Sequence, residues 1–356
     1  SYYVANRSSI KRLTFVLLCI SSIFMLVSLI NGNKGFQITS VLSSKGKAEI
    51  QSLVGNVDIF DNIDDFCLKS NIGLAIVLTP NHLHFEQCEA LLLSGKNVVV
   101  DKPFTVNCEQ ADQLKVIAQS SKLLLSVFHN RRWDGDFLTV KKLLNNDSLG
   151  EIRLFESHFD RFRPVISKKW KEHPGVATGV WFDLGAHLVD QALCLFGLPT
   201  SVTASCLALR DNSKTTDYFH VQMHYPELEV ILHSSPYTAG PNSRFNIKGS
   251  KGCFVKYGLD IQEEQLKKGM LPSQASFGED KLGSYGTLYT SSEESIITSE
   301  KITTEPGDYQ QFYLAIAKAI NGGEPVPVNG EDAINVIKIL ELAVQSSNSG
   351  QNIRLV

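Results

Sequence analysis

The strongest constraint on the fold is a regular alternation of short apolar runs with amphipathic segments over the first third of the chain. Each apolar run ends in polar or turn-forming residues. Buried apolar strands that alternate with helices are typical of βαβ units and a parallel sheet. The expected strands are residues 36–42, 74–78, 98–100 and 123–127, and the expected helices are residues 45–53, 84–93 and 108–120.

Beyond about residue 150 the pattern changes to extended segments joined by Gly, Pro and Asn turns, which is typical of an antiparallel sheet. A chain of 356 residues is too long for one compact core. We therefore expect an α/β domain with a Rossmann-like parallel sheet over residues 1–127, followed by an α+β domain with an open, mainly antiparallel sheet over residues 128–356. The later strands are expected at residues 152–159, 201–209, 220–225, 230–233, 244–249 and 253–257, and the later helices at residues 183–196, 309–320 and 331–345.

Composition excludes several classes of protein. A net charge of −3 with no basic block argues against a nucleic-acid-binding surface. The seven cysteines form no C-x-x-C pair and leave an odd count, so we expect neither a disulfide framework nor a structural zinc site. This usage favours a reducing compartment, and we expect a cytoplasmic protein.

The segment Val98–Pro103 places a lysine, followed by a proline, at the end of an apolar run. Ligands bind at the carboxyl ends of the strands in an open parallel sheet, so Lys102 is a candidate for chemistry. A lysine after a strand is also commonly a solvated loop charge. Pro103 restricts the backbone of Lys102 to extended geometry and so directs its side chain, which favours the functional interpretation.

A second candidate lies in the stretch WFDLGAHLVD, residues 181–190. If a helix begins near Asp183, then Asp183 and His187 are four residues apart and share one face. A carboxylate orients a neighbouring histidine and raises its basicity, which suits proton transfer near neutral pH. The alternative is a capping aspartate and a structural histidine. The pair could also supply two metal ligands, but no third is evident, so we expect no metal site.

Taken in order, these motifs resemble those of the Gfo/Idh/MocA oxidoreductases. The resemblance runs from about residue 35 to the C-terminus, with Asp101-Lys102-Pro103 where the family usually has Glu-Lys-Pro. Within the family the chain is most similar to the NADP-dependent scyllo-inositol 2-dehydrogenase group, through the stretches SVFHNRRWD, FESHFDRFRP and TTDYFH. The other matching motifs are TPNHLH at 79–84, HNRRW at 129–133 and DLGAH at 183–187.

The resemblance implies an enzyme that transfers a hydride between NADP(H) and a CH–OH group of a cyclic polyol or sugar. Oxidation needs a base beside the hydroxyl and a nicotinamide next to the carbon. Lys102, Asp183 and His187 would be catalytic, with His187 as the base and Lys102 stabilising the developing alkoxide, or with these two roles exchanged. The residues expected to line the cofactor are Thr79, Pro80, Asn81, His84, Asp101, Lys102 and Asn130, and those expected at the substrate are Arg161, Arg163, Asp183 and His187. For the two arginines, a charged strand edge is an equal alternative.

Cofactor preference follows from the end of the second expected strand. An NAD-specific site places an acidic residue there, to bind the ribose 2′-hydroxyl. This chain has Ser43, Ser44 and Lys45 instead. Hydroxyl groups and a cation suit a 2′-phosphate, so we expect NADP, with NAD as the other possibility.

The N-terminal segment does not fit a dinucleotide-binding domain. Such a domain opens with a strand and a G-x-G-x-x-G turn, whereas only Gly32 and Gly35 precede Phe36. The run from Leu13 to Ile30 is instead apolar and uncharged, and Arg7, Lys11 and Arg12 precede it, which is typical of a membrane anchor. Three hypotheses remain: an anchor, an unusual first unit with a buried strand and helix, and a segment translated out of frame.

Three function classes follow from these observations. The leading class is a cytoplasmic dehydrogenase that acts on a small polyol or sugar, without nucleic-acid or membrane partners. The second is a degenerate, non-catalytic family member that binds sugar or cofactor, because a chain without the glycine loop loses backbone donors to the pyrophosphate. The third is a membrane-anchored form. An exposed sheet face in the second domain predicts a homo-oligomer, either a dimer or a tetramer.

Overall fold

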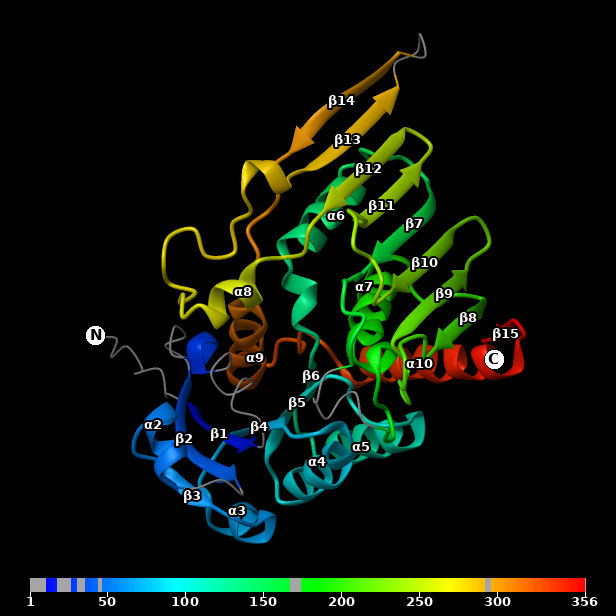
Figure 1. Cartoon of the computed structure of the whole chain (residues 1–356). Coiled ribbons are helices and arrows are strands. Elements are labelled where there is room, and N and C mark those ends of the chain that lie inside the picture. Colours follow the sequence, from blue (N-terminus) through cyan, green and yellow to red (C-terminus); the bar gives the residue numbers. More distant parts are fainter. Residues whose placement is uncertain are drawn as a thin grey trace.

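The computed structural model describes residues 11–17, 27–30, 36–43, 47–166, 174–291 and 296–355. They form two sheets, each with its own helices (Figure 1). The first is a parallel sheet of six strands in the order β3-β2-β1-β4-β5-β6, which confirms the expected Rossmann-like domain. Its strands are β1 (Lys11–Leu17), β2 (Phe36–Ser43), β3 (Asp58–Phe60), β4 (Leu74–Leu78), β5 (Asn97–Asp101) and β6 (Leu125–Phe128).

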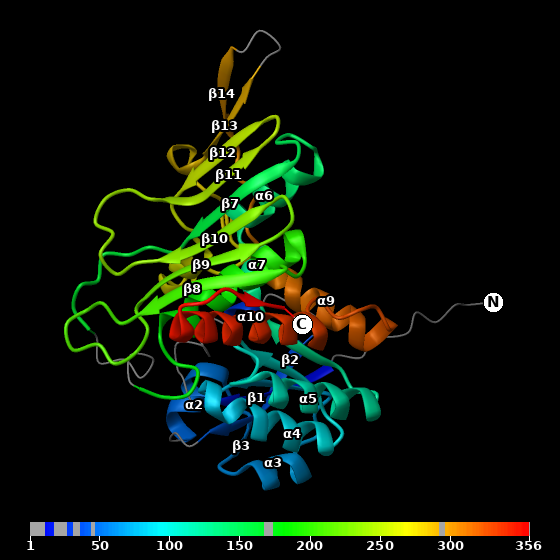
Figure 2. The ribbon, with the colours of Figure 1, turned by 90° about the vertical axis from the view of Figure 1, so that its right-hand side faces the viewer.

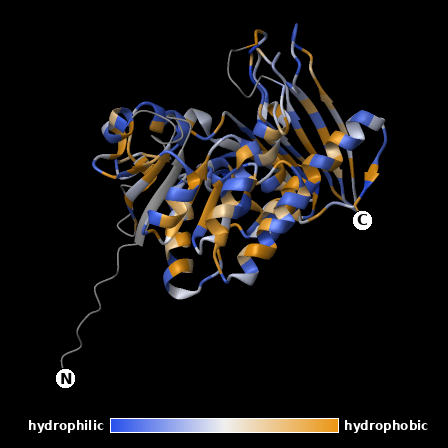
Figure 3. Ribbon diagram, turned by 90° about the horizontal axis from the view of Figure 1, so that it is seen from below, coloured by the Kyte–Doolittle hydropathy of each residue, from blue (hydrophilic) through white to orange (hydrophobic). Residues whose placement is uncertain are grey.

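Apolar side chains explain why the inner strands of this sheet are buried. In β4, the residues from Leu74 to Val77 have no exposed surface, and Val98, Val99 and Val100 of β5 are equally buried. Each helix buries apolar residues, as α5 does with Ala111, Leu114 and Ala118. Figure 3 shows both hydrophobic and hydrophilic residues along these helices. They are α2 (Lys47–Val54), α3 (Ile63–Lys69), α4 (His84–Leu93) and α5 (Cys108–Ser120).

The apolar N-terminal run begins with a strand and not with an anchor helix. Residues 11–17 form β1, which pairs in parallel with both β2 and β4 at the centre of the sheet. Residues 27–30 are helical, and Leu29 and Ile30 are buried. The anchor hypothesis is therefore wrong for residues 11–17, and the strand of the second hypothesis is confirmed. Among the described residues, no helix is long and apolar enough to cross a membrane.

The second sheet has nine strands in the order β14-β13-β12-β11-β7-β10-β9-β8-β15. Only the β7–β10 pair is parallel, so the expected open, mainly antiparallel sheet is confirmed. The strands are β7 (Ile152–His158), β8 (Ser201–Leu207), β9 (Tyr218–His224), β10 (Glu229–Ser234), β11 (Ser243–Gly249), β12 (Gly252–Tyr257), β13 (Gly286–Ser291), β14 (Ile297–Ile302) and β15 (Ile353–Arg354).

Helices of the second domain join the sheet to the first domain (Figures 1 and 2). The longest, α10, contacts α5 of the parallel-sheet domain as well as α7 and β8. Phe155 of β7 packs on Phe196 of α7, so this face of the nine-stranded sheet is the buried one. The helices are α6 (Gly135–Asn145), α7 (Ala186–Phe196), α8 (Gln262–Lys267), α9 (Gln310–Gly322) and α10 (Gly330–Ser349).

Several elements differ from the sequence prediction. The helix expected from Asp183 begins earlier, as a π-helical turn over Trp181–Gly185 that continues into α7. Some elements were not expected at all: most are short or polar and show weak apolar periodicity, whereas α6 was missed although Phe137, Val140 and Leu143 form a buried apolar face. These are β3, α3, α6, α8 and the hairpin of β13 and β14.

Candidate active site

The carboxyl ends of the parallel strands carry most of the predicted site residues. Thr79 follows β4, Asp101 ends β5 and Lys102 comes next, and Asn130 lies two residues beyond the end of β6. In an open parallel sheet these ends form one crevice, where ligands bind. The parallel order therefore brings together residues that lie far apart in the sequence.

The side chain of Lys102, in the first domain, contacts Asp183 in the second domain. Its Nζ lies 2.9 Å from Oδ1 of Asp183, and it also donates a hydrogen bond to the main-chain carbonyl of Asp183. The Lys102 side chain is only 10% exposed, so this is a largely desolvated ion pair and not a solvated loop charge. The Lys102–Pro103 peptide bond is cis. The structure thus brings together two of the three residues that the sequence predicted as catalytic.

Asp183 is presented by the π-helical turn that precedes α7. Short π-helical turns are rare and frequently occur at functional sites. Gly185 permits the turn, because a Cβ at this position would lie 2.2 Å from Cε3 of the Trp181 indole. Trp181 is fully buried, and its Nε1 donates to the carbonyl of Leu340. His187 follows Asp183 by four residues, in the first turn of α7, and is 5% exposed.

A small pocket opens beside this pair. Asn81, which follows β4, donates from Nδ2 to the carbonyl of Ala177 at 2.9 Å. The segment 177–179 was not predicted as part of the site, since a loop of Ala, Thr and Gly carries no titratable side chain to mark it. The pocket is lined by Asn81, Lys102, Pro103, Ala177, Thr178, Gly179 and Asp183.

His84 occupies a structural position. It is completely buried, with Nε2 at 2.8 Å from the carbonyl of Thr79 and Nδ1 at 2.9 Å from the carbonyl of Pro103. Burial lowers its pKa, whereas the charge of Asp101 and the hydrogen bonds to these carbonyls act in the opposite direction, and the ring links the ends of β4 and β5. Thr79 itself is 6% exposed and donates to Gln87 at 2.7 Å. Both side chains therefore position the chain around Lys102, and neither offers an open polar surface.

The remaining predicted cofactor residues are distributed along the same edge. Ser43 ends β2 and is buried, while Ser44 and Lys45 lie outside the described residues. Asp101 accepts the main-chain N–H of Lys102 at 2.9 Å, so its carboxylate fixes the start of this loop. Pro80 precedes the short 3₁₀ turn that carries Asn81. Beyond β1, the described chain resumes only at residue 27.

The two predicted substrate arginines differ in their surroundings. Arg161 stacks its guanidinium on the ring of Phe159, 4.8 Å from the centroid. Burial and the neighbouring charge of Arg163 lower the pKa of Arg161, whereas the Asp183 carboxylate acts in the opposite direction. Arg161 therefore lies within electrostatic reach of the Lys102–Asp183 pair. Arg163 is exposed, as expected for a charged strand edge.

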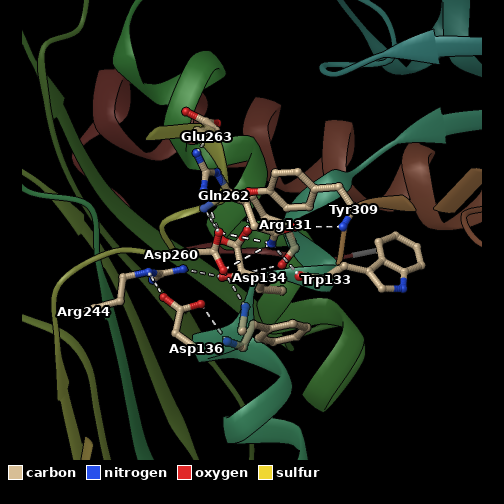
Figure 4. A network of polar contacts seen from close by, with 12 residues as sticks. Arg131, Trp133, Asp134, Asp136, Arg244, Asp260, Gln262, Glu263 and Tyr309 are labelled. Carbon is tan, nitrogen blue, oxygen red and sulfur yellow. Dashed lines mark hydrogen bonds and ion pairs between the residues drawn. The ribbon is translucent and has the colours of Figure 1, made fainter. Parts of the chain in front are cut away.

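The HNRRW motif serves mainly as a buried junction between elements (Figure 4). Arg131 lies 3.1 Å from Oδ2 of Asp134 and 2.6 Å from Oε1 of Glu263 in α8. Asp134 also accepts the hydroxyl of Tyr309, at the start of α9, at 2.7 Å. Burial raises the pKa of Asp134 well above its usual range. This network fixes the chain that follows β6 and thereby the position of Asn130.

Comparison with known proteins identifies the family. Residues 24–129 match the family model described as "Oxidoreductase family, NAD-binding Rossmann fold", and residues 141–355 match the one described as "Oxidoreductase family, C-terminal alpha/beta domain". The chain belongs to the Gfo/Idh/MocA oxidoreductase family. The match to the Rossmann model begins at residue 24, inside the apolar segment of residues 13–30. It therefore covers the carboxyl ends of β2, β4, β5 and β6 but not β1.

Individual Gfo/Idh/MocA relatives are similar over most of their length. The chain is 43% identical to the uncharacterized oxidoreductase YdgJ of Escherichia coli, over 90% of this chain and 91% of that protein. It is 39% identical to the scyllo-inositol 2-dehydrogenase (NADP(+)) IolW of Bacillus subtilis, over 90% of this chain and 89% of that protein. The solved structure of the oxidoreductase yvaA from Bacillus subtilis superposes with a TM-score of 0.95 at 36% identity, over 99% and 100% of the two chains.

Proposed function

We propose that this protein is an NADP(H)-dependent dehydrogenase that oxidises a CH–OH group of a cyclic polyol or sugar of the inositol type. One observation carries the proposal: Lys102, at the end of β5, contacts Asp183 of the second domain at 2.9 Å beside a pocket. A cation and a carboxylate that meet where two domains join are suited to bind and polarise a hydroxyl group.

Each polar residue has a distinct proposed role. The ammonium group of Lys102 stabilises the alkoxide that develops on the substrate oxygen. His187 accepts the hydroxyl proton, and Asp183 orients the substrate while it balances the charge of Lys102. The two roles could also be exchanged, because a lysine and a histidine can each carry a proton. Arg161 is proposed to bind a second hydroxyl group of the substrate, and Arg163 lies further out.

The cofactor is proposed to be NADP(H), which accepts or donates the hydride when bound. The residues proposed to hold it end the parallel strands, from Ser43 on β2 to Asn130 after β6. No acidic residue is present at positions 43–45, which supports a 2′-phosphate over a free ribose hydroxyl. The similarity to an enzyme named for NADP(+) supports the same preference.

The test is a substrate screen on the purified chain. Reduction of NADP⁺ and of NAD⁺ is followed at the nicotinamide absorbance with a panel of inositols and hexoses. We expect turnover with one or more inositols and a higher kcat/KM with NADP⁺. Lys102→Met should lower kcat/KM by about 100- to 1,000-fold, as expected for loss of the group that stabilises the developing alkoxide.

Lys96→Met is the matched control, since Lys96 lies directly before the amino end of the same strand and is 8% exposed. This variant should retain kcat/KM within a few-fold of the wild type. An equal loss of activity in the Lys96 and Lys102 variants would contradict the proposed role of Lys102.

A degenerate, non-catalytic member that binds sugar or cofactor is the second candidate, and the sequence after β1 favours it. Residues 18–26, where a Rossmann domain carries its phosphate-binding turn, contain no glycine. Each charge-assisted backbone hydrogen bond lost from a pyrophosphate costs roughly 1.5 to 3 kcal/mol. Turnover in the substrate screen separates the two candidates, and fluorescence titration with NADPH shows whether a chain without turnover still binds the cofactor at micromolar concentrations. The coding DNA tests the frameshift hypothesis: a shifted frame that encodes a Gly-x-Gly turn upstream of Phe36 would support it.

A further inference from the structure

Three histidines form a row across neighbouring strands of the nine-stranded sheet. His233 of β10 pairs with His158 of β7 on one side and with His220 of β9 on the other. The ring centroids are 5.4 Å apart for His158 and His233, and 5.7 Å apart for His220 and His233. Three imidazoles thus lie side by side at the same level of the sheet.

The row lies on the face of the sheet opposite the helices. In β9 and β10, the alternating neighbours Phe219 and Leu232 are fully buried, and Phe219 packs on Trp181 of the π-helical turn. Because side chains alternate between the two faces of a strand, the histidines point away from this core. We call the surface around His158, His220 and His233 the outer face. The active-site pair of Lys102 and Asp183 lies on the other side.

Asp160 completes the cluster, directly after the end of β7. Its Oδ1 lies 3.0 Å from Nδ1 of His233, and its Oδ2 lies 3.9 Å from Nδ1 of His158. The main-chain N–H of Ser235 and the amide of Asn242 also donate to this carboxylate and fix its orientation. One ligand atom each from His158, Asp160 and His233 lies within 4.8 Å of the others.

The electrostatics of the cluster favour a cation. Burial lowers the pKa values of His158 and His220, which keeps both rings in the neutral form that binds metal ions. Burial alone would raise the pKa of Asp160, but hydrogen bonds from His233, Asn242 and Ser235 outweigh it and lower this pKa. The hydrogen bonds to Asp160 thus favour its ionised form, which is the form that binds a cation.

We propose that His158, Asp160 and His233 form a binding site for a divalent first-row transition-metal ion, such as Zn²⁺ or Co²⁺. Two imidazoles and one carboxylate are a common ligand set for these ions. Atoms that coordinate a tetrahedral zinc ion lie roughly 3.3 Å apart, so small side-chain rotations bring the three ligand atoms into range. His220 is the nearest further imidazole, and Asn242 supports the carboxylate ligand.

The structural alternative is a hydrogen-bonded His233–Asp160 pair that needs no ion. It explains the 3.0 Å contact. It leaves Nδ1 of His158 without a hydrogen bond of normal length, although the side chain of Asn242 and, at 3.9 Å, the carboxylate of Asp160 lie beside it. A metal ion supplies the missing partner of this buried nitrogen.

The proposed metal site is connected through the main chain to Arg161, which lies near the Lys102–Asp183 pair. At the end of β7, His158 and Asp160 face outward, whereas Phe159 between them is buried and its ring stacks on the guanidinium of Arg161. An ion bound to His158 and Asp160 would hold this segment in place from the outer face. We therefore expect bound metal to raise the melting temperature of the protein.

The experiment uses the full chain after EDTA treatment. Zn²⁺ is titrated by calorimetry, and Co²⁺ by its visible absorption, which reports nitrogen and oxygen ligands directly. We expect one ion per chain in the wild type. His233→Gln and His158→Gln should each weaken binding at least about 100-fold, and Asn242→Ala by about 10- to 100-fold, as expected for an outer-shell partner.

The matched control is His224→Gln. His224 lies on the same strand as His220 but pairs with Glu229 at 2.9 Å and is not part of the cluster. It should bind metal like the wild type. The proposal is overturned if the wild type binds Zn²⁺ no more tightly than His233→Gln and His158→Gln, or if His224→Gln loses affinity as much as they do. Circular dichroism in EDTA checks that each variant is folded, and none of these readouts depends on dehydrogenase activity.

Discussion

Replacing Gly185 by alanine should both destabilise the protein and disturb the site. The added Cβ would lie 2.2 Å from Cε3 and 2.6 Å from Cζ3 of Trp181. The indole has no room to retreat, because it is fully buried, packs on Phe219 and donates to the carbonyl of Leu340. Overpacking costs about 1–3 kcal/mol, and loss of the indole hydrogen bond adds about 1 kcal/mol. We therefore expect a loss of about 2–4 kcal/mol in the free energy of unfolding.

Urea denaturation followed by tryptophan fluorescence measures this loss, and a dehydrogenase assay measures the effect on the site. Asp183 lies two residues before Gly185 in the same π-helical turn, so its contact with Lys102 should shift and kcat should fall. Gly322→Ala is the control, since nothing lies within 4 Å of a Cβ at that position in α9. It should stay within about 1 kcal/mol of the wild type.

A double-mutant cycle sharpens the test. Trp181→Leu removes the atoms with which the new methyl group collides, so the effects of the two substitutions should not add. The reasoning is refuted if Gly185→Ala unfolds at the same urea concentration as the wild type. Strictly additive effects in the cycle would refute the proposed collision.

Three further predictions concern cofactor choice, pH dependence and the ion-pair network. Ser43→Asp should shift the ratio of kcat/KM for NADP⁺ and NAD⁺ toward NAD⁺, and an unchanged ratio would rule out this strand end as the ribose site. Burial raises the pKa of Asp260 from 3.8 to about 6. Between about pH 4 and pH 6 the folded state therefore binds more protons than the unfolded state, and the free energy of unfolding falls as the pH rises through this window. Asp260→Asn should reduce this decline by about 3 kcal/mol across the window in unfolding titrations, while Asp134, whose pKa is also raised, contributes equally in both proteins; an unchanged decline would rule out Asp260. In the wild type, Arg132 lies 2.7 Å from the carboxylate of Asp190. Arg132→Met leaves this buried carboxylate without its cation and should lower the free energy of unfolding, measured by urea denaturation, by about 3–5 kcal/mol. A loss below about 1 kcal/mol would contradict this reasoning.

The local pattern of the sequence was sufficient for the class of each domain. Apolar strands between amphipathic helices predicted the parallel sheet, because strands covered on both faces must be apolar along their whole length. Alternating strands with short turns predicted the antiparallel sheet. The polar residues after β4 and β5 then predicted the crevice, since parallel strands end at one edge. β3 is too short to give a signal, and α6 was missed although Phe137, Val140 and Leu143 form an apolar face.

The N-terminal segment shows the limit of pattern recognition. Residues 13–30 have the length and composition of a membrane helix, yet their first part is a strand between β2 and β4. Hydropathy does not distinguish a buried strand from a membrane helix, because both exclude water on all sides. Pairing with strands on both sides decides between them, and pairing is a property of the folded chain.

The sequence by itself determined the two domain classes and the residue types of the site, because both depend on local periodicity and on side-chain chemistry. Only the tertiary structure decided which of these residues meet. Lys102 and Asp183 are 81 residues apart, and their contact depends on how the π-helical turn approaches the end of β5. The histidine row depends on the register of β7, β9 and β10, which hydrogen bonds between strands set. Contacts across such distances depend on packing, and packing is not encoded in any short stretch of sequence.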